Sequence, residues 1–249
     1  MTTDSSDREG MRINKYIAHA GVCSRRDADD LVEQGRVQID GERVEQHGTR
    51  VQEGQTVTVD GEEVYPLEFE YLLLNKPKDT ISTTDDPKGR QTVLDVIGVP
   101  GDNPSGLFPV GRLDRNTTGV LLVSNDGDLA HRLMHPRYEI PKIYYVRLQD
   151  AVKPHQLDQL ERGMELSDGE AAADQVAYLD PQRKTDIALE LHEGRNRQIR
   201  RMMENLGHDI VQLERAKYAT LTTGRLQRGE WRRLEPDEVR ELYQRVDLQ

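Results

Sequence analysis

One short stretch of the chain places a carboxylate between two arginines, a combination that could do chemistry. The stretch is residues 111–119, where Asp114 has Arg112 and Arg115 as close neighbours. A nearby positive charge favours the ionised form of a carboxylate, and a positioned carboxylate can act as a nucleophile or a base. The alternative is a turn residue that bonds its own backbone, with both arginines in solvent.

Apolar runs on both sides of this stretch must position it. Residues 108–110 and 120–123 are short and rich in residues that favour β-strands, so they predict two buried strands joined by a tight loop. Gly111 and Gly119 stand at the two ends of the loop, which suits a backbone that turns sharply.

The loop closely resembles the catalytic loop of pseudouridine synthases, in which Gly-Arg-Leu-Asp followed by Thr/Ser-Gly carries the essential aspartate. The match continues through residues 121–127, which are similar to the branch that acts on ribosomal RNA, the RsuA, RluB and RluF group. The resemblance implies that Asp114 is the catalytic residue. It also implies that Arg112 fills the gap left when the target base flips out of the RNA.

A second motif lies in residues 142–148, whose alternation predicts a strand. Tyr144 shares one face of this strand with Val146 and Leu148, so core packing alone would explain it. The segment also resembles the family motif Lys-x-Tyr-x-Val. That resemblance implies that the Tyr144 ring stacks on the target uracil.

A third motif, residues 194–200, resembles the family pattern Gly-Arg-x-x-Gln-Ile-Arg. It opens a predicted helix whose buried stripe includes Ile199, Met202, Met203 and Leu206. Arg200 borders this stripe and needs a partner, and we expect that partner to be Asp114, as the resemblance also implies. Arg195 and Arg197 are expected to contact RNA; a basic, solvated helix face is the alternative.

Residues 11–59 predict a small module of two short helices followed by short strands. Its basic groups lie at or next to the helix ends. Helix N-termini favour phosphate, and arginines there reinforce such a site, although a solvated face is the alternative. The segment resembles the S4 RNA-binding module over nearly its full length. The residues expected to bind RNA here are Arg12, Lys15, Arg25, Arg26 and Arg36.

Composition sets limits on these expectations. The chain has 249 residues with 45 acidic and 34 basic side chains, so RNA binding would depend on a local basic patch rather than on net charge. It contains no apolar run of 18 residues and no signal-peptide core. Its single cysteine, Cys23, excludes an internal disulfide. We therefore expect a cytoplasmic protein without a membrane partner, and a monomer.

Other candidate residues receive a structural interpretation. His131 and His135 have zinc-ligand spacing, but no acid or cysteine nearby in the sequence completes a ligand set, so we expect ordinary helix-face histidines and no metal. Lys76 and Lys78 could contact phosphates, but loop lysines are more often merely solvated. Trp231 is expected in the core.

The expected fold is α+β: a disordered tail at residues 1–10, an S4 domain at 11–60, a linker at 61–69 and a catalytic domain at 70–249. The catalytic domain is expected to be a mixed, largely antiparallel sheet with flanking helices. The resemblance implies isomerisation of uridine in ribosomal RNA or ribosome assembly intermediates, with 23S favoured over 16S, and no cofactor. A non-catalytic RNA-binding protein and an enzyme acting on transfer RNA are the alternatives.

Overall fold

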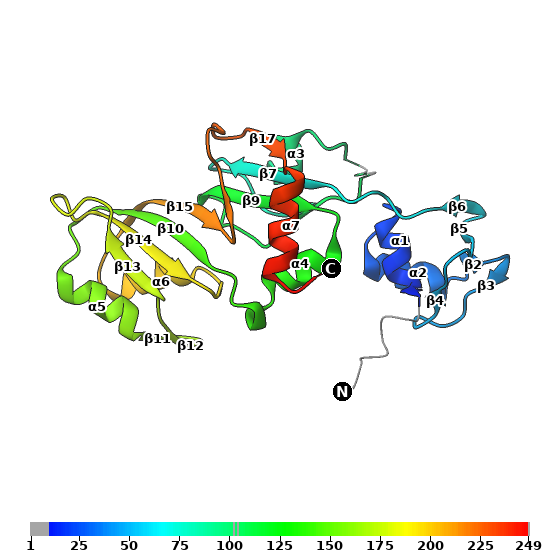
Figure 1. Ribbon diagram of the computed structural model, residues 1–249, viewed down its shortest axis with the longest axis horizontal. Coiled ribbons are helices and arrows are strands. Elements are labelled where there is room, and N and C mark those ends of the chain that lie inside the picture. The colour runs from blue at the N-terminus through cyan, green and yellow to red at the C-terminus, as the bar shows by residue number, and fades with distance from the viewer. Residues whose placement is uncertain (1–9, 102, 104, 249) are drawn as a thin grey trace. The chain divides into compact units, whose positions relative to one another are not determined.

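Separate hydrophobic cores divide the chain into two units (Figure 1). The computed structural model describes residues 10–101, 103 and 105–248. The first unit comprises the described residues up to Glu70 together with those of the segment 100–107, and the second comprises 71–99 and 108–248. Apart from Gly10, the tail expected at residues 1–10 lies outside the described residues.

The first unit contains two helices packed on short strands. Ser24 caps the second helix by accepting a hydrogen bond from the Asp27 backbone N–H at 3.3 Å. Ile13, Ile17 and Ala28 are fully buried between the helices and the strands. The elements are β1 (Met11–Arg12), α1 (Ile13–His19), α2 (Arg25–Glu33), β2 (Val37–Ile39), β3 (Glu42–Arg43), β4 (Arg50–Val51), β5 (Val57–Val59) and β6 (Glu62–Val64).

Strand β6 lies inside the segment expected to be a linker. It pairs antiparallel with β5, with Val57 opposite Val64, and completes a four-stranded sheet of order β3-β2-β5-β6. Glu62 and Glu63 are exposed and Val64 is only partly buried. An edge strand of this kind has a weak sequence signal, because its register is set by the neighbouring strand rather than by its own apolar residues.

The second unit is built on a nine-stranded sheet in the described part of the chain. The central order is β13-β14-β10-β15-β9-β7-β17, with β16 paired to β15 and β8 paired to β9. The β9–β15 pair is parallel and the other pairs in this sheet are antiparallel. The strands are β7 (Tyr71–Lys76), β8 (Phe108–Val110), β9 (Thr118–Ser124), β10 (Lys142–Leu148), β13 (Gln175–Tyr178), β14 (Asp186–Leu191), β15 (Ile210–Tyr218), β16 (Leu221–Thr222) and β17 (Trp231–Arg233).

Helices cover both ends of this sheet. Leu129 of α4 and Leu242 of α7 share a core with Leu73, Val120 and Leu122 of the strands, whereas α5 and α6 lie at the end formed by β10, β13 and β14 (Figure 1). A separate hairpin, β11 (Met164–Leu166) and β12 (Gly169–Ala171), lies beside α6. The helices are α3 (Val93–Ile97), α4 (Gly127–Met134), the 3-10 turn η2 (Pro136–Tyr138), α5 (Pro154–Arg162), α6 (Gln198–Asn205) and α7 (Pro236–Arg245).

The expected fold class is therefore confirmed, as a mixed and mostly antiparallel sheet with helices after a small N-terminal unit. None of the described helices has the length and apolar character needed to cross a membrane.

Candidate active site

The loop that carries Asp114 joins β8 to β9, as the sequence predicts. Gly111 and Gly119 have φ values of 78° and 105°, in the region that favours glycine. Gly119 also faces β15 so closely that an added Cβ would lie 2.1 Å from the Arg215 carbonyl oxygen. Inside the loop, the Thr117 N–H donates to the Asp114 carbonyl at 3.0 Å. The loop is thus fixed by backbone contacts on both sides.

A buried lysine binds the backbone of the loop. Lys76, at the end of β7, is fully buried, and its Nζ donates to the carbonyls of Pro77, Asp114, Arg115 and Thr117 at 3.0–3.2 Å. Burial lowers the pKa of Lys76 to about 8. The expectation of a solvated Lys76 is wrong, because the carbonyls that bind it belong to a loop about 40 residues further along the chain.

Two arginines of the third motif face the Asp114 carboxylate. The Nε atom of Arg200 lies 3.4 Å from Asp114 Oδ2, and Nη1 of Arg197 lies 3.9 Å from the same oxygen. The Arg200 side chain is 17 % exposed and that of Asp114 is 34 % exposed. The sequence neighbour Arg115 instead pairs with Asp79 at 2.6 Å. The charge partners of Asp114 in the structure therefore come from the α6 region.

Asp114, Tyr144 and Arg200 line one small cavity of about 90 Å³. Tyr144 is buried on β10, and Leu191 and Leu213 from β14 and β15 add apolar walls. The cavity therefore combines a carboxylate paired with cations, an aromatic ring and apolar surface. Such a site can hold a planar ring against the tyrosine and present the carboxylate to an atom next to that ring.

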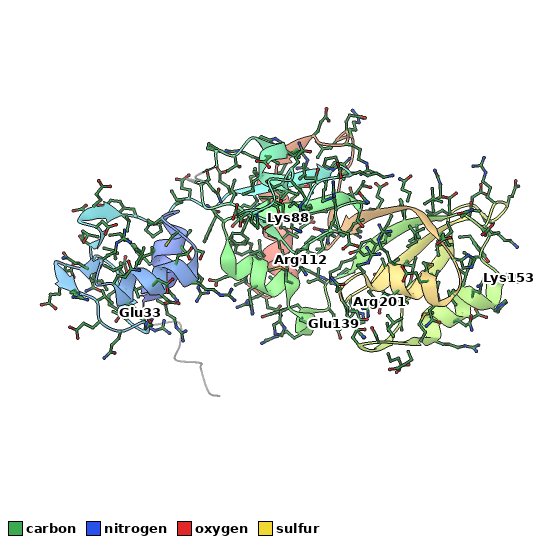
Figure 2. All side chains as sticks on the ribbon, turned by 180° about the vertical axis from the view of Figure 1, so that it is seen from behind. Glu33, Lys88, Arg112, Glu139, Lys153 and Arg201 are labelled. Carbon is green, nitrogen blue, oxygen red and sulfur yellow. The ribbon has the colours of Figure 1, made fainter. Side chains whose placement is uncertain are left out.

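A wider groove of about 930 Å³ also reaches Asp114 and Tyr144. Arg112 lines both the cavity and the groove, and its side chain is exposed on the loop (Figure 2). The Arg112 side chain is therefore accessible to a ligand that occupies the groove.

Lys142 is a partly buried cation of this groove that the sequence reasoning did not single out. Its Nζ donates to the carbonyls of Ile140 and His192, both at 2.7 Å. Burial, and next the charge of Arg215, lower the pKa of Lys142 to about 8. The sequence signal was present, since Lys142 opens the second motif.

Arg215 was also missed. It is 3 % exposed, its Nε donates to the Val120 carbonyl at 2.8 Å, and its guanidinium lies 4.5 Å from the centre of the Tyr218 ring. Its Nη2 atom is buried without a hydrogen-bond partner among the described residues. On a strand that alternates between buried and half-buried positions, the sequence does not distinguish such an arginine from an exposed one.

Arg195 lines both the cavity and the groove with a side chain that is 28 % exposed, and it is also bound by groups of the protein. Its guanidinium donates to Glu193 at 3.0 Å and to the carbonyls of Gly169 at 3.2 Å and of Glu170. These acceptors already occupy most of its donors, and the RNA contact expected of Arg195 stays a prediction. Arg197, by contrast, is half exposed.

The basic residues of the first unit also differ in whether groups of the protein already bind them. Arg12, Arg25 and Arg26 are exposed, and Lys15 is partly buried on α1. Arg36 makes two hydrogen bonds to the Asp60 carboxylate, at 2.7 and 2.5 Å. The exposed arginines at the starts of α1 and α2 fit the predicted phosphate site better than Arg36 does.

The rings of His131 on α4 and of His135, directly after α4, are tilted by 50° to one another, with ring centres 5.3 Å apart. The Nδ1 atom of His135 accepts the Arg137 backbone N–H at 3.2 Å. Among the residues that the structure describes, no three His, Cys, Asp or Glu side chains gather as metal ligands would. Trp231 is 40 % exposed on the edge strand β17, so the expectation of a core tryptophan is wrong.

The chain was compared with known proteins. The profile of the family described as RNA pseudouridylate synthase matches residues 70–205, and that of the S4 domain matches residues 11–57. The chain is 41 % identical over 239 residues to ribosomal large subunit pseudouridine synthase B of Bacillus subtilis, covering 95 % of this chain and 97 % of the relative. It is 36 % identical to the protein of the same name from Yersinia pestis, covering 96 % of this chain and 77 % of that one.

A solved structure supports the same assignment. It is described as a pseudouridylate synthase, with a TM-score of 0.66 and 28 % identity, covering 94 % of this chain and all of the other. This likeness extends across nearly the whole chain, and both profiles lie where the two units lie. The chain belongs to the RNA pseudouridylate synthase family.

Proposed function

We propose that this protein converts one or more uridines of ribosomal RNA, with 23S rRNA as the substrate, to pseudouridine. The observation that carries the proposal is the cavity in which Asp114, Arg200 and Tyr144 converge. The choice of substrate is supported by the Bacillus and Yersinia relatives, whose names specify the large ribosomal subunit.

The reaction moves a base without changing its composition. The bond between N1 of uracil and C1′ of ribose breaks, the uracil turns, and C5 bonds to C1′. C5 loses a proton and N1 gains one, so the atoms balance without an oxidant, a reductant or water. Asp114 either attacks C1′ or removes the 2′ proton. Arg200 and Arg197 oppose its negative charge, and Tyr144 stacks on the uracil.

The target base must first leave its RNA helix, and a base in a loop is the least costly to extrude. Arg112, exposed beside the cavity, fills the space that the base leaves. Arg12, Lys15, Arg25 and Arg26 contact phosphates through the S4 domain. Arg36 is assigned to folding instead, because the Asp60 carboxylate binds it. Arg195 both holds the β11–β12 turn and lines the cavity, where it contacts the RNA.

The test uses the full-length protein and unmodified transcripts of 23S rRNA, 16S rRNA and transfer RNA. After incubation, carbodiimide treatment and primer extension locate each pseudouridine. The same mapping is done on ribosomal RNA from cells that lack the gene. A site in 23S rRNA that appears in the reaction and disappears in these cells supports the proposal. Modification of transfer RNA alone, or of no RNA, contradicts it.

We further propose that the protein works as a monomer in the cytoplasm, where its RNA substrate is assembled into ribosomes. Light scattering coupled to size exclusion should give a mass near the 28.5 kDa of the chain. A mass of twice that value would contradict the monomer.

A further inference from the structure

The turn of the β11–β12 hairpin is bound by an arginine from α6. The Asp168 carboxylate accepts two hydrogen bonds from Arg201, from Nη1 at 2.7 Å and from Nη2 at 2.9 Å. Nη1 also lies 3.3 Å from the Ser167 hydroxyl oxygen. These hydrogen bonds lower the pKa of Asp168. A two-point pair of this kind fixes orientation as well as distance.

A second arginine, Arg195 in the loop before α6, binds the same turn. Nη1 of Arg195 donates to the Gly169 carbonyl and lies 3.7 Å from Asp168 Oδ1, while Nη2 donates to the Glu170 carbonyl. The backbone N–H of Arg195 donates to the Gln198 side chain at 3.1 Å. The hairpin therefore holds both the loop before α6 and the helix itself.

The residues that face Asp114 lie between these two anchors. Arg197 precedes the first residue of α6 and has φ 49° and ψ 32°, a left-handed conformation that is unfavourable for arginine. Such a conformation persists where the surroundings fix it, and it concentrates at functional sites. Arg200 follows three residues later, directly before the anchored Arg201.

We propose that Asp168 is a positioning residue of the reaction. By holding Arg201 and Arg195, it keeps residues 195–201 in the geometry in which Arg200 and Arg197 face the Asp114 carboxylate. Asp168 acts on the reaction indirectly, since it does not line the cavity that contains Asp114. The inference rests on the proposed function, because it concerns the same reaction.

The test compares Asp168→Asn with Asp186→Asn. Asp186 pairs with Arg147 at 2.6 Å on β14 and β10, away from α6, so its substitution also frees one surface arginine. Rates of single turnover at saturating RNA, RNA dissociation constants and melting temperatures are measured for both. We expect Asp168→Asn to slow turnover about tenfold, because small displacements of catalytic groups have effects of this size or larger. RNA affinity should stay within about threefold for both variants, since neither side chain lines the cavity or the groove.

A double-mutant cycle tests whether Asp168 acts through Arg200. In the Arg200→Lys background the precise placement of the guanidinium is already lost, so Asp168→Asn should slow turnover clearly less than in the wild type. The inference would be overturned if Asp168→Asn slowed turnover by the same factor in both backgrounds. It would also be overturned if Asp168→Asn turned over at the wild-type rate, or if its rate loss only matched a loss of folded protein. An inactive wild type would contradict the proposed function, whereas an active wild type equalled by Asp168→Asn contradicts the positioning role alone.

Discussion

Replacing Lys76 by methionine should destabilise the protein and disable the loop that carries Asp114. Methionine has a similar length but neither charge nor hydrogen-bond donors. In the wild type, Nζ of Lys76 is the donor to four carbonyls, three of which belong to the loop. The substitution therefore removes the Lys76 hydrogen bonds to the loop that carries Asp114 while leaving the packing volume nearly unchanged.

Two opposing free energies set the size of the effect. Burial shifts the pKa of Lys76 from 10.5 to about 8, so holding the charged amine in the folded protein costs about 3 kcal/mol. Methionine removes this cost. A buried carbonyl left without a donor costs about 1–3 kcal/mol. The carbonyls of Pro77 and Thr117 lose their donor, whereas those of Asp114 and Arg115 keep the backbone N–H groups of Thr117 and Thr80. The loss of donors should slightly exceed the gain, with a net destabilisation of about 1 kcal/mol at pH 7.

The free energy of unfolding should depend on pH in a direction that packing alone would not produce. Because the pKa of Lys76 is lower in the folded state than in the unfolded state, the unfolded chain binds more protons between pH 8 and 10.5. The contribution of Lys76 to the free energy of unfolding therefore rises with pH across this window. The Lys76→Met variant lacks this contribution, so its deficit relative to the wild type should grow from pH 7 to pH 10.

Urea unfolding at pH 7 and pH 10 measures the difference in the free energy of unfolding between Lys76→Met and the wild type. The single-turnover rate on an rRNA fragment at pH 7 measures whether the loop still places Asp114 for the reaction. Lys78→Met is the control, because Lys78 is exposed two residues away; it should unfold as the wild type does at both pH values. If Lys76→Met were as stable and as active as the wild type, the assignment of Lys76 as the support of the loop would be refuted.

Three further predictions concern other contacts. Arg200→Ala should slow turnover about 100-fold. It should destabilise the protein by about 1–2 kcal/mol. This is less than for a fully buried ion pair, because Asp114 is partly exposed and keeps Arg197 as a neighbour. Arg197→Ala should have smaller effects on both turnover and stability. Changing Arg25 and Arg26 together to Ala should weaken RNA binding and reduce its logarithmic salt slope by about 2, as filter binding across a salt series would show. Asp126→Asn should lower stability by about 1–3 kcal/mol in urea unfolding, because two tyrosine hydroxyls donate to one of its oxygens.

The sequence predicted the elements around Asp114 because their signals are local. The two apolar runs beside the loop and the bracketing glycines define strand, loop and strand without reference to the rest of the chain. The proximity of Arg200 to Asp114 was also accessible, since an arginine at the border of a buried stripe needs a partner.

The missed features depend on contacts between distant segments. Lys76 is buried because loop carbonyls about 40 residues away surround it, and Arg195 is engaged because the hairpin turn lies beside it. Neither set of acceptors has a side-chain signature, since each is mainly backbone. The strand β6 was likewise taken for a linker because its pairing with β5, and not its composition, defines it.

The central claim is that the Asp114 carboxylate carries out the chemistry, and Asp114→Asn tests it most directly. The amide is nearly the same shape but can act neither as a nucleophile nor as a base. The substrate is an rRNA fragment with tritium at C5 of its uridines, because forming the bond from C5 to C1′ releases that hydrogen to water. We predict no tritium release above background, with RNA affinity within about threefold of the wild type. Release within about tenfold of the wild-type rate would contradict the claim, because loss of the reacting group should cost far more.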